Sequence, residues 1–104
     1  MIYVDELMEY GPAFYRGEDA AQAQRVGEKN GHRWCHLFAT DADCEELHDF
    51  AFQLGLRLSW FQKNHYDLTP GRRTKAVKLG AIEVTRRQAV AIRRAQRGEA
   101  GHAL

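Results

Sequence analysis

Short apolar runs recur along the chain and are separated by longer polar or amphipathic stretches. Residues 2–4 (IYV) and 32–39 (HRWCHLFA) are rich in β-branched, aromatic and aliphatic side chains and are short, which predicts two strands. Residues 56–61 (LRLSWF) alternate between apolar and polar, and residues 81–84 (AIEV) form another short apolar run. The pattern therefore predicts three to four strands, with Asp5 at the end of the first.

A clear amphipathic helix is predicted between the second and third of these strands. Thr40 and Asp41 are candidate caps for its start, and Gly55 follows its last apolar residue. Acidic and amide side chains occupy one side of the helix (Glu45, Glu46, Asp49 and Gln53), and apolar side chains the other (Cys44, Leu47, Phe50, Ala51 and Leu54).

Two more helices are predicted in the last third of the chain. Thr69 followed by proline is typical of a helix start, and the segment ends at Gly80. Thr85 and Gln88 have the spacing of a capping box, which predicts a last helix that ends near Gly98. Residues 98–104 are expected to be a frayed tail.

The order of these elements predicts an α/β fold. From residue 32 onward strands and helices alternate, and parallel strands need connections of that length, so we expect a mostly parallel sheet of three to four strands with about three helices. Residues 10–31 contain four glycines and one proline and lack a strong apolar stripe, which predicts a loop or a short helical excursion. A length of 104 residues fits one small domain, residues 1–104.

Composition and cysteine content indicate a folded, cytoplasmic protein. Apolar residues make up 44% of the chain and charged residues 28%, which is typical of globular proteins. The first residues are acidic where a signal peptide needs basic ones, and polar side chains interrupt the longest apolar stretch, residues 50–61, so neither secretion nor membrane insertion is expected. Cys35 and Cys44 lack a CxxC spacing, and we expect both to be reduced.

Charge is segregated along the chain although the net charge is only +1. Residues 1–69 hold 6 Lys or Arg and 12 Asp or Glu, whereas residues 70–104 hold 9 and 2. The basic C-terminal third predicts a surface for a phosphate-bearing ligand or nucleic acid. Internal pairing, a homodimer, a protein partner or a solvated basic face are the alternatives. The last helix lacks aromatic residues, so its sequence gives no support for base-specific recognition of single strands.

The segment with the most chemistry is residues 60–67 (WFQKNHYD), which lies between a predicted strand and a helix start. Ligands of open α/β sheets bind at such positions. His65 can transfer a proton or bind a metal, and Asp67 can orient an imidazole or bind a metal. The remaining candidates for ligand contacts nearby are Gln62, Tyr66, Arg72, Arg73 and Lys75. The alternative is that His65 and Asp67 cap a turn beside a solvated basic helix.

Three further residues are candidates for the same site. His36 on a strand, His48 on a helix and Asp5 at a strand end can converge near one edge of the sheet, with His36 joining His65 and Asp67 as catalytic candidates. The spacing matches neither HExxH nor a paired zinc signature nor a known facial triad, so a divalent metal is only one alternative. A zinc site at Cys44 and His48 is disfavoured, because buried free cysteines are common.

Several short motifs resemble those of a family of short bacterial and phage proteins described as a domain of unknown function. The motifs are YVD, WxHLxA, ELHxFA, WFQ, HYDLT and GAIEVT, and they carry Asp5, His36, His48, Trp60, Gln62, His65, Tyr66, Asp67 and Arg73. The resemblance covers most of the chain outside residues 10–31 and implies no known activity. The stretch from Gly11 to Gly31 is longer than expected for the family, and Arg86 stands where a tryptophan is expected.

Three hypotheses for the function follow from these observations. The first is a pocket that binds a phosphorylated ligand, either a nucleotide or nucleic acid, through His, Asp and Arg side chains. The second is a phosphoester hydrolase that uses the His/Asp cluster with or without a metal. The third is a protein-interaction module, such as a phage-encoded inhibitor or adaptor, anchored by Trp60 and Phe61. The sequence alone leaves open whether the protein is an enzyme.

Overall fold

The buried strand predicted at residues 32–39 is present as β3 (Arg33–Ala39) and lies in the middle of the sheet. The structure is a computed structural model and describes residues 1–40 and 44–102. The other strands are β1 (Ile2–Val4), β2 (Met8–Glu9), β4 (His65–Leu68) and β5 (Ile82–Glu83). The α-helices are α1 (Ala20–Lys29), α2 (Glu45–Gln53), α3 (Pro70–Lys78) and α4 (Arg86–His102), and two 3-10 turns are η1 (Pro12–Phe14) and η2 (Leu58–Trp60). The predicted α/β class is confirmed.

The sheet is mixed, so the prediction of mostly parallel pairing is wrong. β3 pairs antiparallel with β1, β2 and β4, and β1 pairs parallel with β5. The argument from connection length failed because it requires consecutive strands to enter the sheet from the same end. Here α2 and η2 return the chain to the end of the sheet at which β3 stops, and β4 then runs back along β3.

The predicted strand at residues 56–61 is also wrong, because this segment contains the 3-10 turn η2. Its apolar residues do not share one face, since Leu56 is buried whereas the side chain of Leu58 is 66% exposed. The strand lies a few residues later, at β4, where half-buried His65 and Asp67 alternate with buried Tyr66 and Leu68. A tight turn with Lys63 at φ 55° leads into it.

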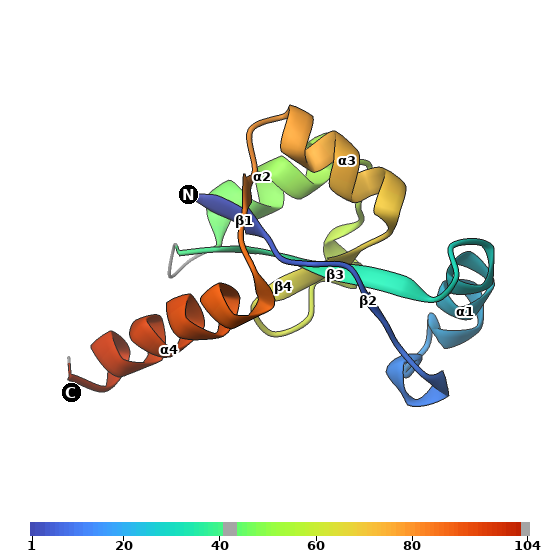
Figure 1. Cartoon of the computed structure of the whole chain (residues 1–104), viewed down its shortest axis with the longest axis horizontal. Coiled ribbons are helices and arrows are strands. Elements are labelled where there is room, and N and C mark those ends of the chain that lie inside the picture. The colour runs from blue at the N-terminus through green and yellow to red at the C-terminus, as the bar shows by residue number, and fades with distance from the viewer. Residues whose placement is uncertain (41–43, 103–104) are drawn as a thin grey trace.

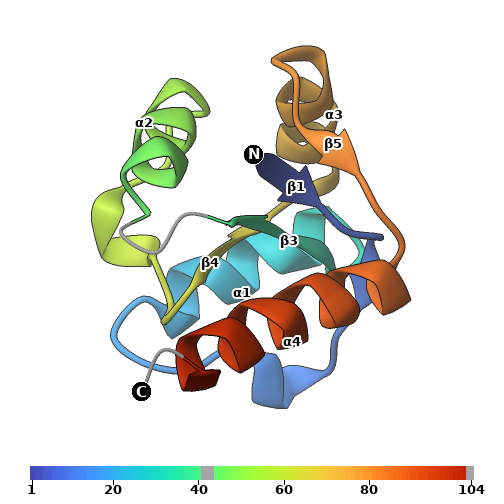
Figure 2. The same ribbon diagram turned by 90° about the vertical axis from the view of Figure 1, so that its left-hand side faces the viewer.

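Alternation along the strands gives the sheet two different faces. Val4, Cys35, Leu37, Tyr66 and Leu68 point to the face covered by α2 and α3 and form the hydrophobic core with residues of those helices. Figures 1 and 2 show α2 and α3 on one side of the sheet and α1 and α4 on the other. The face on the side of α1 and α4 is the second face of the sheet. It is the face on which polar strand residues can meet a ligand.

Helix ends follow the sequence closely. The Thr69 hydroxyl accepts a hydrogen bond from the Arg72 amide at 3.4 Å and starts α3. The capping box of α4 is confirmed, because the Thr85 amide donates to Gln88 Oε1 at 2.8 Å and the Gln88 amide donates to Thr85 Oγ1 at 3.1 Å. Gly55 and Gly80 follow α2 and α3 with positive φ angles of 77° and 109°.

Two predicted helix boundaries differ from the structure. The residue that precedes α2 is Cys44, with φ 60°, so Thr40 does not cap this helix, and Asp41 lies outside the described residues. The helix α4 continues to His102 rather than ending near Gly98, and the last two residues of the predicted tail lie outside the described part. No helix within the described residues is long and apolar enough to span a membrane.

The excursion at residues 10–31 is anchored to the sheet by aromatic side chains. The Tyr15 hydroxyl accepts a hydrogen bond from Trp34 Nε1 at 3.1 Å and lies 2.8 Å from His32 Nδ1. Gly27 of α1 is buried directly beneath this hydroxyl, where a Cβ atom would overlap it. The excursion therefore contains a ten-residue helix, α1, whose position depends on a glycine.

Replacing Gly27 by alanine tests this packing. We expect Gly27→Ala to lower the free energy of unfolding by about 1–3 kcal/mol, because the new methyl group displaces Tyr15 from His32 and Trp34. Urea unfolding followed by tryptophan fluorescence measures the change. Gly11→Ala is the matched control, since Gly11 has a φ of −82° and open space around it. Equal stability of the two variants would contradict the packing argument.

Candidate functional site

Three residues far apart in the sequence form a row across the second face of the sheet. His36 pairs with Asp67 in the register of β3 and β4, and the Asp5 amide donates to the His36 carbonyl at 3.2 Å just beyond β1. His65 lies in the adjacent row, where its partner on β3 is Phe38. Because alternate strand residues share a face, Asp5, His36, His65 and Asp67 all lie on the side away from the core.

The carboxylate of Asp5 fixes His36. One of its oxygens accepts a hydrogen bond from the His36 amide at 2.6 Å, and the other lies 2.7 Å from His36 Nδ1. Asp5 is only 3% exposed, so few water molecules compete for these contacts. On the other side, Arg73 Nε donates to the Asp5 carbonyl at 2.8 Å and Arg73 Nη1 pairs with Glu83 at 3.0 Å. His36 is thus left with Nε2 as its free ring nitrogen.

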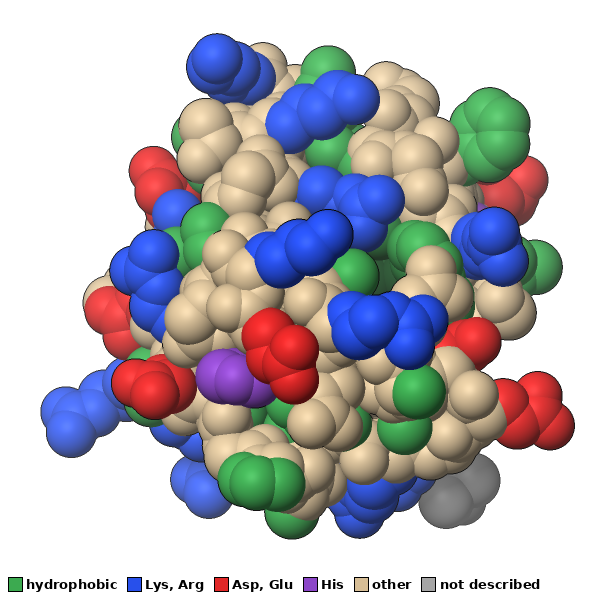
Figure 3. Space-filling model, turned by 90° about the vertical axis from the view of Figure 1, so that its right-hand side faces the viewer, with side chains coloured by type: hydrophobic (Ala, Val, Ile, Leu, Met, Phe, Trp, Pro, Cys, Tyr) green, Lys and Arg blue, Asp and Glu red, His purple; other side chains and the backbone are tan. Residues whose placement is uncertain are grey.

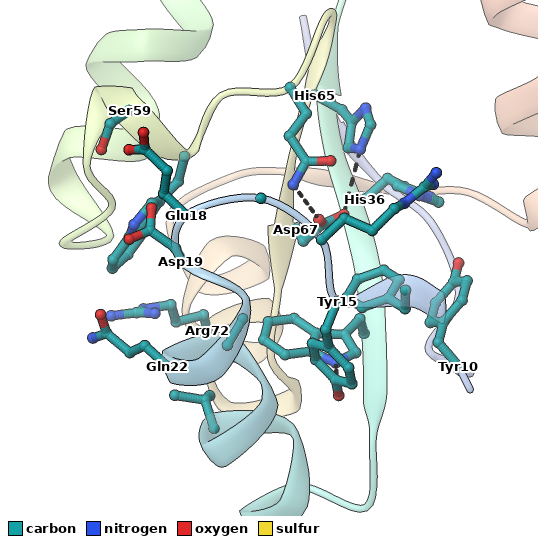
Figure 4. Close-up of a pocket in the computed structure, with 18 residues that line it drawn as sticks. Tyr10, Tyr15, Glu18, Asp19, Gln22, His36, Ser59, His65, Asp67 and Arg72 are labelled. Atoms are coloured by element: carbon teal, nitrogen blue, oxygen red, sulfur yellow. Dashed lines mark hydrogen bonds and ion pairs between the residues drawn. The ribbon is translucent and has the colours of Figure 1, made fainter. Parts of the chain in front are cut away.

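His65 and Asp67 are held in a similar way, each by one atom. His65 Nδ1 lies 3.1 Å from the Asn64 side-chain oxygen, and Gln62 Nε2 donates to Asp67 Oδ2 at 3.2 Å. The remaining atoms face each other, with 3.4 Å between His65 Nε2 and Asp67 Oδ1. In Figure 4 dashed lines join Asp67 to its partners, and the His36 side chain lies beside it.

These residues form a cluster, His36, His65 and Asp67, that can hold a metal ion. The two imidazole rings meet edge to face with 4.7 Å between their centroids. One donor atom from each of the three residues lies within 4.8 Å of the other two. The side chains of His36, His65 and Asp67 are 21%, 18% and 13% exposed, so the cluster is accessible from solvent.

The cluster opens onto a pocket of about 640 Å³. Aromatic side chains from Tyr10, Phe14, Trp34 and Trp60 line it, and Phe14 packs between Tyr10 and Trp34. Figure 4 shows the cluster on one side of the pocket and Arg72, Asp19, Glu18 and Ser59 on the other. The sequence analysis missed the contribution of the excursion, although its aromatic residues at positions 10, 14 and 15 were a signal that it packs on something.

Other candidate residues lie in different places. His48 Nδ1 lies 2.8 Å from the Tyr66 hydroxyl on the core side of the sheet, so neither side chain reaches the cluster. Arg73 supports Asp5 from behind and does not line the pocket, and Lys75 is exposed on α3 away from the lining. The structure therefore brings together His36, His65, Asp67 and Gln62, with Asp5 as a support and Arg72 across the pocket.

The pocket lining carries charges of both signs, with Arg16 and Arg72 beside Glu18, Asp19 and Asp67. Arg72 lies over the ring of Trp60, 5.6 Å from its centroid, and both side chains line the pocket. Arg86, at the start of α4, is close enough to lower the pKa of Tyr10, although burial and the Asp5 carboxylate raise that pKa more. Figure 3 shows Lys and Arg side chains over the upper and middle part of the face that carries α1 and the start of α3, with Asp and Glu side chains among them.

The thiol of Cys35, which lies next to the cluster in the sequence, is buried. Burial, and secondarily the Asp5 carboxylate, raises the pKa of the Cys35 thiol to about 12. Its side chain points to the core, opposite to His36. Neither Cys35 nor Cys44 forms a disulfide.

The chain belongs to a protein family that has no assigned function. Residues 19–96 match the family described as "Protein of unknown function (DUF4031)". This region contains His36, His65 and Asp67 and begins after Asp5. Searches of curated proteins and of solved structures gave no match.

Thiol labelling tests the environment of Cys35. With iodoacetamide at pH 8 and the protein folded, we expect Cys44 to react much faster than Cys35, because Cys35 is 1% exposed and almost entirely protonated at this pH. Mass spectrometry of peptides at successive times gives the two rates. In denaturant both thiols are expected to react at similar rates. Faster reaction of Cys35 in the folded protein would show that the thiol is activated.

Proposed function

We propose that the protein hydrolyses a phosphoester in a nucleotide or nucleic acid, with the reacting phosphate at His36, His65 and Asp67. The observation that carries this proposal is the convergence of two imidazoles and one carboxylate on the wall of an open pocket. Each of the three side chains is held through one atom and presents another toward its neighbours. Binding of the same ligand without cleavage is the simpler form of the proposal.

The cluster offers what hydrolysis of a phosphoester requires. The attacking water must lose a proton. A side-chain base can accept this proton, and a metal ion can make its loss easier by lowering the pKa of the water. The carboxylate of Asp5 at His36 Nδ1 fixes that ring nitrogen as the donor, so Nε2 is free to accept a proton or bind a metal. The Asn64 side-chain oxygen at His65 Nδ1 gives the second imidazole a similar orientation, with Nε2 toward Asp67.

The charges that favour a phosphorylated ligand are Arg16 and Arg72 in the pocket lining, which also contains Glu18 and Asp19. Arg72 lines the pocket opposite the cluster, where its guanidinium can pair with phosphate oxygens in a fork-like geometry. Residues 70–104 hold 9 Lys or Arg against 2 Asp or Glu, and Arg86 acts on Tyr10 at the pocket wall. A polyanion such as nucleic acid would be attracted to this part of the surface over a long range.

Variants of the cluster test the catalytic proposal. On a panel of nucleotides, oligonucleotides and bis(p-nitrophenyl) phosphate, we expect His36→Ala and Asp67→Asn to lower kcat/KM by about 100-fold or more. His48→Gln is the matched control and is expected to retain full activity, because this imidazole lies across the sheet. An inactive wild-type protein that still binds the panel would reduce the proposal to binding. No turnover and no binding would refute it.

The role of Arg72 is tested separately. We expect Arg72→Gln to raise KM for the phosphorylated substrate by about tenfold with a smaller change in kcat, because a charged hydrogen bond to phosphate is lost. Lys78→Gln on the same helix removes the same charge from an exposed position outside the pocket lining. Equal effects of the two substitutions would mean that Arg72 acts only through the overall positive charge of the helix and does not contact the phosphate.

A further inference from the structure

We infer that His36, His65 and Asp67 bind one divalent first-row transition-metal ion, zinc being the ion that suits these ligands best. The ion would lie at the site of the proposed function and would lower the pKa of the attacking water there. The catalytic role of the ion therefore rests on the proposed function. The metal site itself does not depend on that proposal for its evidence, because metal binding is argued from the side-chain contacts alone.

The strongest argument is that the nitrogen or oxygen of each side chain that would not bind the metal already has a hydrogen-bonding partner. A histidine that binds a metal through one ring nitrogen almost always gives its other nitrogen to a carboxylate, a carbonyl or water. His36 Nδ1 contacts the Asp5 carboxylate at 2.7 Å, and His65 Nδ1 contacts the Asn64 side-chain oxygen at 3.1 Å. Asp67 is held in the same sense by Gln62 at 3.2 Å. All three candidate ligands therefore have a supporting partner.

The free atoms of these side chains point to one place. His36 and His65 meet edge to face, and a donor atom of each lies within 4.8 Å of a donor atom of Asp67. Zinc binds imidazole nitrogen and carboxylate oxygen at about 2.0–2.2 Å, so small rotations of these partly buried side chains bring all three onto one ion. His36 and Asp67 are also paired in the strand register, which fixes the backbone distance between them.

Charge gives a second, independent argument. Two carboxylates, Asp5 and Asp67, lie within contact distance of two imidazoles, and in their neutral form these rings do not offset the negative charge. These two carboxylates oppose the approach of a phosphate to the cluster itself, whereas Arg72 lies on the opposite wall of the pocket. A divalent cation between His36, His65 and Asp67 reverses the local sign, so the same pocket then attracts phosphate.

The ligand set also selects the kind of metal. Magnesium and calcium prefer oxygen ligands, whereas imidazole nitrogen favours zinc and its first-row neighbours. Three protein ligands leave a position open for water, which is the arrangement of catalytic rather than structural zinc sites. The exposure of 13–21% at these side chains leaves room for that water on the pocket side.

Metal titration of the chelator-treated full chain tests the inference without any substrate. Isothermal titration with Zn²⁺ and visible absorption with Co²⁺ are expected to show one bound ion per chain, and Mg²⁺ is expected to give no comparable signal. His36→Ala, His65→Ala and Asp67→Ala are each expected to abolish this stoichiometric binding. His48→Gln is expected to retain it, because His48 contacts Tyr66 across the sheet.

Two more variants test the supporting partners. Asp5→Asn and Gln62→Ala are expected to weaken Zn²⁺ binding by about 10–100-fold without removing a ligand. Gln62 is exposed, so the Gln62→Ala variant is expected to fold even if the Asp5→Asn variant, which changes a buried carboxylate, does not. Circular dichroism checks the fold of both variants. Unchanged affinity in a folded Gln62→Ala variant would mean that this contact does not support a metal ligand.

The outcomes separate this inference from the proposed function. No saturable binding of Zn²⁺ or Co²⁺, or binding that persists in all three ligand variants, would overturn the metal site. Phosphoester cleavage that continues in excess chelator would overturn the catalytic role of the ion while leaving the proposed function intact. One metal ion bound through His36, His65 and Asp67, without turnover of any phosphoester, would confirm the metal site and refute the hydrolase.

Discussion

The two hydrogen bonds that the Asp5 carboxylate accepts from His36 hold the site to the fold. They join the end of β1 to the middle of β3, and the carbonyl of the same residue is bound by Arg73 from α3. Arg73 in turn pairs with Glu83 on β5, so Asp5 and Arg73 together link three strands and a helix. A carboxylate that is 3% exposed requires such partners, because burial of an unpaired charge is costly. The free nitrogen of His36 is therefore aimed by the tertiary structure rather than by its local sequence.

Most helices were predictable because their signals are local. The starts of α3 and α4 depend on Thr69 and Thr85, whose side chains bond amides three residues away, and the apolar stripe of α2 is visible within one short segment. The sheet was harder, since strand pairing is a contact between distant residues. Residues 56–61 contain more apolar side chains than β4, yet β4 is the segment whose alternation matches the second face of β3. Whether a segment forms a strand therefore depended on its pairing with β3 and not only on its own apolar content.

The candidate site could be predicted in part for the same reason. The chemistry of His65 and Asp67 is evident from their types and spacing, and Asp5 and His36 were added on the expectation that strand ends converge. His48 was included as well, although the helix that carries it covers the opposite face. Which histidines meet depends on the side of the sheet to which each points, and a change of one residue in register would exchange the two sets. The walls contributed by residues 10–19 gave no signal beyond their aromatic content.

The contacts of His65 and Asp67 also differ from those of residues that cap a turn. A capping side chain spends its oxygen on a backbone amide, as Thr69 does with Arg72. Within the described part of the chain, His65 and Asp67 instead contact side chains, namely Asn64, Gln62 and each other. Each keeps one donor atom at the pocket, as does His36 on the neighbouring strand. Hydrogen bonds to the backbone therefore do not explain this cluster. A bound cation or phosphate would contact the donor atoms that His36, His65 and Asp67 present at the pocket.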